Sequence, residues 1–204
     1  MMLAVGGNDP EAGIEETVGT VVAALEGEGP DVHLVGHSLG GITIPVVAAR
    51  RPVARMVFLC SFMPEPGRSF RETMAAEEGA FRTAWRTVPR VVHDDRSSSW
   101  EPDVAVELFY HDCPDDLARW AASRLRRQSW RTSAEPCPLE CWPDVPSSSI
   151  LCTGDRAVAP EWSRAAARKR LGVEAIELPG GHSPMLSRPA GLAGVLARLE
   201  GVEE

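Results

Sequence analysis

The feature that most constrains the fold of this chain is the sequence Gly36-His37-Ser38-Leu39-Gly40, which directly follows a short apolar run at positions 32–35. A Gly-x-Ser-x-Gly sequence between a strand and a helix is typical of a nucleophile elbow, a sharp turn with serine at its tip. The turn strains the serine backbone and projects its Oγ clear of the sheet, while flanking glycines let neighbouring backbone approach. The pattern predicts a strand over residues 32–36, a helix over residues 40–50 and a reactive Ser38. The alternative is an ordinary serine in a glycine-rich turn.

A reactive Ser38 requires a general base, because a serine hydroxyl is by itself a weak nucleophile. Of the five histidines, only His182 lies between a predicted strand and a predicted helix after all the other elements. The strand is expected over residues 173–178 and the helix over residues 184–199, with Pro179-Gly180-Gly181 ending the strand. His182 is therefore the candidate base. The alternative is a turn histidine with no special role.

The candidate acid is Asp155, which follows a buried strand predicted over residues 148–153 and precedes a helix predicted over residues 160–170. A carboxylate at the end of a strand can orient the His182 imidazole and stabilise its protonated form. The rival is Asp144, which precedes the same strand and would therefore lie at the opposite edge of the sheet. The alternative for Asp155 is an ordinary turn aspartate.

Four stretches of the chain resemble the α/β-hydrolase superfamily, and more narrowly its small esterase and hydroxynitrile-lyase-like branch, which includes plant methyl esterases. These stretches are residues 34–41 (LVGHSLGG), 109–114 (FYHDCP), 152–160 (CTGDRAVAP) and 180–189 (GGHSPMLSRP). The resemblance implies an α/β-hydrolase fold with Ser38, Asp155 and His182 as a catalytic triad and with neither metal nor cofactor. Hydroxynitrile lyases carry a lysine directly after the catalytic histidine. This chain has Ser183 there, which favours ester hydrolysis over cyanohydrin cleavage.

The front of the chain departs from this family, whose members begin with a hairpin and a strand that ends in an oxyanion-hole loop. Residues 1–5 resemble the end of the family's fourth strand, so we expect about forty residues to be absent, since a βαβ-type unit takes roughly 30 or more. The two explanations are a truncated gene product and a misassigned start codon. The Leu39 N–H is then one oxyanion donor, and the second is missing or comes from Gly6-Gly7. Without the family's third strand, residues 32–35 form an edge unless Met1–Val5 covers it, and we expect self-association there.

Composition narrows the remaining function classes. A length of 204 residues suits one domain, and a net charge of −8 with no basic stripe argues against nucleic acid as a partner. No apolar run reaches transmembrane length and no signal peptide is visible, so we expect no membrane association. The odd number of cysteines suggests reduced thiols in the cytoplasm. Cys137-x3-Cys141 lacks a second ligand pair, which argues against zinc.

The order of the predicted elements indicates a parallel sheet with helices on both faces. The core is expected over residues 1–60 and 148–204, including a helix over 11–26 and a strand over 55–60. Residues 61–147 form an insertion without clean strand–helix alternation, with a helix expected over 105–127. In the family that the chain resembles, such an insertion is a cap over the active site, so the resemblance implies a mostly helical cap here. Caps exclude water and shape the substrate pocket. For the aromatic and sulfur side chains that could line this pocket, core packing is an equal alternative: Phe62, Met63, Phe81, Trp85, Phe109 and Trp130.

These features together predict two-step acyl transfer from a small, uncharged ester, because an apolar pocket in a negatively charged protein does not attract anions. Two other classes stay open. The first is a catalytically impaired binding protein or fragment with the same fold. The second is a hydroxynitrile lyase or a cofactor-free perhydrolase that uses the same triad.

Overall fold

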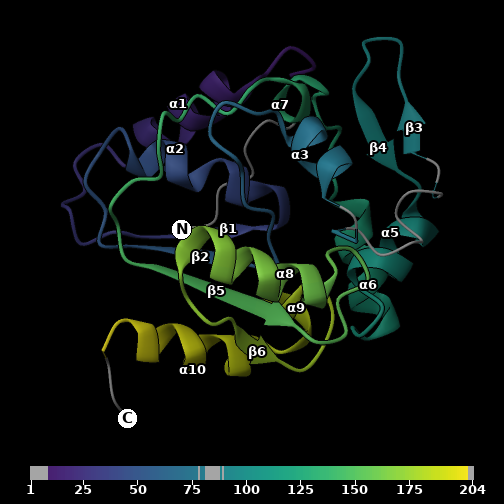
Figure 1. The fold of residues 1–204 in the computed structure, drawn as a ribbon. Helices are drawn as coiled ribbons and strands as arrows, with labels where there is room; N and C mark the ends of the chain where they lie inside the picture. The colour runs from purple at the N-terminus through teal and green to yellow at the C-terminus, as the bar shows by residue number, and fades with distance from the viewer. Residues whose placement is uncertain (1–8, 78, 81–87, 89, 202–204) are drawn as a thin grey trace.

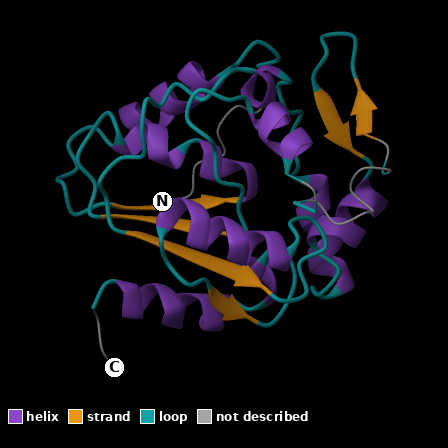
Figure 2. Ribbon diagram, in the orientation of Figure 1, coloured by secondary structure: helices purple, strands orange, loops and turns teal. Residues whose placement is uncertain are grey.

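A four-stranded parallel sheet forms the centre of the molecule (Figure 2). The computed structural model describes residues 9–77, 79–80, 88 and 90–201. In spatial order the strands are β1 (His33–His37), β2 (Arg55–Leu59), β5 (Ser147–Cys152) and β6 (Ile176–Leu178). The register runs from His33 opposite Arg55 to His37 opposite Leu59. Because all four strands are parallel, their carboxyl ends lie at one edge, where α/β proteins place their sites.

Helices cover both faces of this sheet, which confirms the predicted layers (Figure 1). On one face, Met56 and Phe58 of β2 pack in the main core with three helices: α1 (Ile14–Ala24), α2 (Ile44–Ala48) and α8 (Pro160–Ala166). On the other face, Val57 and Leu59 pack against α10 (Pro189–Leu199). Successive residues of β2 therefore face opposite layers, and both sets are buried, as a parallel strand requires.

Prolines divide two helices that the sequence pattern predicted as continuous. In place of one helix over 40–50, a 3-10 turn at Ser38–Ile42 precedes α2, which has Pro45 in its first turn. The helix predicted over 184–199 is split into α9 (Pro184–Ser187) and α10, because the residue before Pro189 is pushed out of the helical region. Proline is tolerated in a first helical turn, where its missing N–H has no acceptor within the helix.

The N-terminus of α1 depends on a distant residue. The helix begins at Ile14 and not at the predicted residue 11. Glu16 accepts a hydrogen bond from the Gly13 N–H, and Glu135 accepts one from the Ile14 N–H at 2.8 Å. These two carboxylates satisfy backbone donors that lack partners within the helix and favour its positive end. Glu135 comes from the insertion, so the insertion helps to set where α1 starts.

The segment between β2 and β5, predicted to be an insertion over residues 61–147, contains several short elements and not the single long helix predicted over 105–127. The helix is broken at His111–Pro114, since proline disfavours helix at the residue before it. A hairpin also appears, which the sequence pattern did not predict. The elements are α3 (Phe70–Ala76), β3 (Arg90–Val92), β4 (Ser98–Trp100), α5 (Pro102–Phe109), α6 (Asp115–Ser123) and α7 (Arg131–Ala134).

Two parts of the insertion pack differently. Met74, Cys137 and Leu139 are buried in the main core beside the sheet helices, so this part of the insertion shares the core. Helices α5 and α6 form a second cluster that includes Leu108 and Ala118, together with Ala157 from the loop after β5. Figure 1 shows these two helices beyond the arrowhead of β5, on the side of the strands' carboxyl ends. The insertion is therefore placed to cover that edge.

Strand β1 pairs with β2 alone among the described residues. Val35 of β1 lies opposite Val57 of β2, yet its side chain is 44% exposed while that of Val57 is 1% exposed. Met1–Val5, the alternative partner for this edge, lie outside the described part of the chain. Self-association through the edge therefore stays a prediction.

No described helix is long and apolar enough to cross a bilayer.

Candidate active site

Ser38 occupies the strained turn that its motif predicted. It follows β1 directly and has a φ of 53°, a left-handed conformation that non-glycine residues rarely adopt. The turn is held from the neighbouring strand end: the Ser38 carbonyl oxygen accepts hydrogen bonds from the Phe62 N–H at 3.1 Å and from the Ser61 hydroxyl at 2.8 Å. Surrounding structure that fixes a strained residue in this way is typical of functional sites.

Only one of the two motif glycines around Ser38 has the role that the motif suggested. A Cβ on Gly36 would lie 2.9 Å from the carbonyl oxygen of Gly40, so Gly36 permits the close turn as expected. A Cβ on Gly40 itself would meet nothing within 4 Å. The second tight position is Gly41, where a Cβ would lie 1.9 Å from Ser61 Oγ and 2.1 Å from the Phe62 carbonyl oxygen. The expectation that Gly40 permits close approach of neighbouring backbone was therefore wrong, and Gly41 has that role.

Asp155 and His182 form a buried pair at the same edge of the sheet. Asp155 follows β5 and His182 follows β6; each is 2% exposed, and 2.9 Å separates Asp155 Oδ2 from His182 Nδ1. Asp155 Oδ1 accepts hydrogen bonds from the N–H groups of Ala157 and Val158 at 2.8 and 3.0 Å. A carboxylate only accepts, so Nδ1 of His182 carries the proton and Nε2 keeps its lone pair. The rival Asp144 is exposed and precedes β5, at the opposite edge.

His37, next to Ser38, contacts the loop of His182. Its Nε2–H donates a hydrogen bond to the His182 carbonyl oxygen at 2.8 Å, and the centroids of the two rings lie 4.7 Å apart. Burial, and then the neighbouring His182 ring, lower the pKa of His37 from 6.5 to about 3. His37 is therefore a neutral donor that steadies the backbone of His182. The sequence pattern indicated packing at the turn but not this bond.

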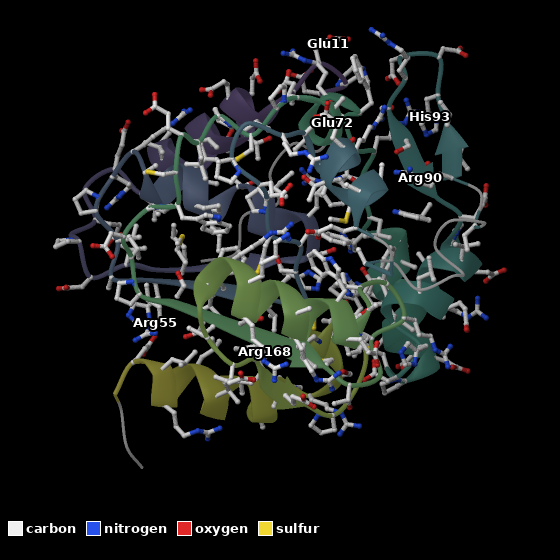
Figure 3. All side chains as sticks on the ribbon, viewed as in Figure 1. Glu11, Arg55, Glu72, Arg90, His93 and Arg168 are labelled. Atoms are coloured by element: carbon white, nitrogen blue, oxygen red, sulfur yellow. The ribbon has the colours of Figure 1, made fainter. Side chains whose placement is uncertain are left out.

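The other three histidines lie in different surroundings. His33 at the start of β1 has its Nδ1 3.8 Å from a Glu200 carboxylate oxygen. His93 on the β3–β4 hairpin contacts the Ser99 hydroxyl at 2.9 Å, and Figure 3 shows it away from the sheet. His111 donates a hydrogen bond to the Gly154 carbonyl oxygen at 3.0 Å. Of the five histidines, His182 is the one paired with a buried carboxylate.

The candidate pocket residues lie in different parts of the structure. The Phe109 ring centroid lies 5.4 Å from that of His182, so Phe109 borders the site. Phe62 and Met63 are each 1% exposed and belong to the main core. Trp130 lies beside the β3–β4 hairpin, with the Arg96 guanidinium 4.5 Å from its ring centroid. Phe81 and Trp85 lie outside the described residues.

Leu39 presents one backbone donor beside Ser38. It is the second residue of the 3-10 turn, and the first N–H groups of a helical turn have no acceptor within it. Such N–H groups stabilise an oxyanion when they point at the reacting carbonyl. The Gly6-Gly7 backbone, predicted as an alternative second donor, lies outside the described residues.

Two adjacent insertion residues, His111 and Asp112, contact the loops of the acid and the base. His111 binds Gly154, and Asp112 Oδ2 accepts a hydrogen bond from the Gly181 N–H at 2.7 Å. The sequence pattern assigned neither residue a role. Both lie in the stretch 109–114 that carried part of the family resemblance, and that stretch was the available signal.

The cysteines show no metal-binding arrangement. Within the described ranges, no group of three His, Cys, Asp or Glu side chains could hold a metal ion. Cys137 is buried and Cys141 is exposed. A hydrogen bond with Cys152, together with burial, raises the pKa of the Cys60 thiol well above its ordinary value. A protonated, buried thiol is a poor nucleophile, so Cys60 does not compete with Ser38.

A strained serine after one strand, with a buried histidine–aspartate pair after two others, is the arrangement typical of serine hydrolases with an α/β fold. A family model described as "Alpha/beta hydrolase family" matches residues 5–195. The chain belongs to the α/β-hydrolase family, as its motifs predicted.

The chain is also similar to curated relatives and to a solved structure. Methyl jasmonate esterase 1 of Vitis vinifera is 26% identical over 186 residues, which cover 84% of this chain and 70% of that protein. Salicylic acid-binding protein 2 of Nicotiana tabacum is 28% identical over 184 residues, covering 82% and 70%. The crystal structure of a pyrethroid hydrolase from Sphingobium faniae JZ-2 matches with a TM-score of 0.78 at 21% identity, over 97% of this chain and 84% of that one. The last likeness shows the fold.

Proposed function

We propose that this α/β hydrolase cleaves carboxylic esters through an acyl-enzyme on Ser38, with His182 as general base and acid and Asp155 as its orienting carboxylate. The observation that carries the proposal is the buried 2.9 Å contact between Asp155 Oδ2 and His182 Nδ1, at the edge where the strained Ser38 lies. Relatives named as esterases and hydrolases support the reaction class.

The mechanism follows from the hydrogen bonds of the pair. His182 Nε2 takes the proton of Ser38 Oγ as the oxygen attacks the ester carbonyl. The imidazolium that forms is stabilised by Asp155, whose other oxygen is held in place by two backbone N–H groups. The Leu39 N–H donates to the oxyanion. His182 then protonates the leaving alcohol and activates a water molecule that releases the acid.

The substrate class follows from the surroundings of the base. Phe109 lies against the His182 ring and presents an apolar surface at the site. The net charge of −8 disfavours anionic substrates through long-range repulsion. We therefore propose a small, uncharged ester as substrate. Two relatives, named methyl jasmonate esterase and pyrethroid hydrolase, are consistent with this class.

The proposal is tested by hydrolysis of p-nitrophenyl acetate and butyrate by the whole chain. Ser38→Ala should lose turnover, while Ser123→Ala, an exposed serine on α6, should keep it. If folded wild type hydrolyses the esters no faster than folded Ser38→Ala, the chain has no Ser38-dependent turnover, which would instead indicate a binding protein with this fold. Parallel assays of cyanohydrin cleavage and of hydrogen peroxide-dependent halogenation test the lyase and perhydrolase alternatives.

A further inference from the structure

Two consecutive side chains of the insertion hold the two loops that carry the acid and the base. His111 Nε2–H donates to the carbonyl oxygen of Gly154, and Asp112 Oδ2 accepts from the N–H of Gly181. Gly154 directly precedes Asp155, and Gly181 directly precedes His182. Each contact therefore lies one residue from a member of the buried pair.

The two loops are also bonded to each other. The Gly154 N–H donates to the Gly180 carbonyl oxygen at 2.9 Å, and the Thr153 N–H donates to the Leu178 carbonyl oxygen at 2.9 Å. With the bonds to His111 and Asp112, these contacts link three segments: the acid loop, the base loop and the connection between α5 and α6. Displacement of the connection would therefore move both loops.

The glycine pair before His182 is explained by the same contacts. A Cβ on Gly181 would lie 2.6 Å from Asp112 Oδ1 and 2.8 Å from His111 Nε2. A Cβ on Gly180, whose φ is 114°, would lie 2.7 Å from Arg188 Nε and 2.8 Å from Asp112 Oδ2. A larger residue at position 181 would displace Asp112 or His111, and one at position 180 would displace Asp112 or Arg188. Asp112 therefore restricts both positions.

A packing role alone does not explain an aspartate at position 112. Its Oδ1 is buried without a hydrogen-bond partner among the described residues, while its Oδ2 makes the single bond to Gly181. A buried polar atom that lacks a partner costs stability, and the cost is higher for a charged group. An apolar side chain would avoid this cost but could not bind the Gly181 N–H. The carboxylate is thus better suited to positioning than to stability.

We propose that Asp112 and His111 are positioning residues, which hold the Asp155 and His182 loops at the separation that their hydrogen bond requires. This rests on the proposed esterase function. Neither side chain is proposed to touch the substrate. Catalysis depends steeply on geometry, and a misplacement of about 1 Å can cost roughly a hundred-fold in rate. The connection between α5 and α6 therefore belongs to the catalytic apparatus, although it supplies no member of the triad.

The test compares Asp112→Ala and Asp112→Asn, with Asp103→Ala, an exposed residue of α5, as control. Three quantities are measured: kcat and KM on p-nitrophenyl butyrate, the thermal midpoint, and the downfield NMR resonance of the His182 Nδ1–H. Asp112→Ala should lower kcat by about a hundred-fold with little change in KM, and should shift or broaden the resonance. Asp112→Asn keeps an oxygen for Gly181 and should restore both. Asp103→Ala should match wild type.

His111→Ala provides a second test, because it removes only the bond to Gly154 and should lower kcat by about ten-fold, from one lost positioning contact. Wild-type kcat and an unmoved resonance in both folded alanine variants would overturn the proposal. So would a fall in kcat that only follows the folded fraction. Failure of the esterase proposal is recognised separately: wild type would show no Ser38-dependent turnover, while the resonance, which needs no substrate, would still report on Asp112.

Discussion

Replacement of Asp155 by asparagine should disable the site by reversing one hydrogen bond. Oδ1 of Asp155 accepts from the N–H groups of Ala157 and Val158, so in Asp155→Asn the amide oxygen takes this place and the NH₂ group faces His182. Two donors cannot face each other, so His182 Nδ1 loses its proton and Nε2 gains one. The ring then cannot accept the Ser38 proton. The same reversal in a serine protease lowers kcat by roughly ten-thousand-fold, or about 5 kcal/mol of barrier.

The assay is p-nitrophenyl butyrate hydrolysis under saturating substrate, with the thermal midpoint as a check on folding. Asp144→Asn is the matched control, because Asp144 is exposed at the amino end of β5 and should not affect kcat. The reasoning is refuted if folded Asp155→Asn keeps kcat within about ten-fold of wild type, or if Asp144→Asn abolishes activity.

Three further predictions concern the fold around the site. Gly41→Ala should lower the free energy of unfolding by about 2 kcal/mol, because its Cβ meets Ser61 Oγ and the Phe62 carbonyl oxygen; unchanged urea denaturation would contradict this. The pKa of His37 is about 3 in the folded protein and 6.5 in the unfolded chain. Between these two pH values the unfolded state binds more protons, so the free energy of unfolding decreases as the pH falls from 6.5 toward 3. His37→Gln should flatten that part of the profile, and identical profiles would argue against it. Val35→Lys should reduce self-association through β1 in light scattering, whereas a wild-type monomer at all concentrations would exclude such association.

Local patterns in the sequence located the site because each part depends on adjacent residues. The elbow needs a strand, a strained serine and close-packed glycine, and all of these lie within residues 32–41. Asp155 and His182 each follow a strand, and parallel strands bring their carboxyl ends together. Position along the chain was therefore enough to predict that these side chains meet.

Contacts between residues far apart in the chain have no comparable pattern in the sequence, so they were not predicted. The bond between Asp112 and Gly181 joins residues 69 positions apart, and the cap of α1 by Glu135 spans 121 positions. Neither contact produces a periodic signal, since each uses one polar side chain on an irregular segment. The break before Pro189 differs from these contacts, because the restriction that proline imposes on the preceding residue is local and could be predicted from the sequence.

An activated Ser38 is the central requirement of the proposed esterase function. A fluorophosphonate probe reacts with serine only when a base removes its proton, so it needs no knowledge of the natural substrate. Intact-mass and peptide analysis of the labelled whole chain should place one adduct on the peptide containing Ser38. Labelling should be lost in Ser38→Ala and strongly reduced in His182→Ala. Folded wild-type protein that takes no label, or takes it at another serine, would contradict the account.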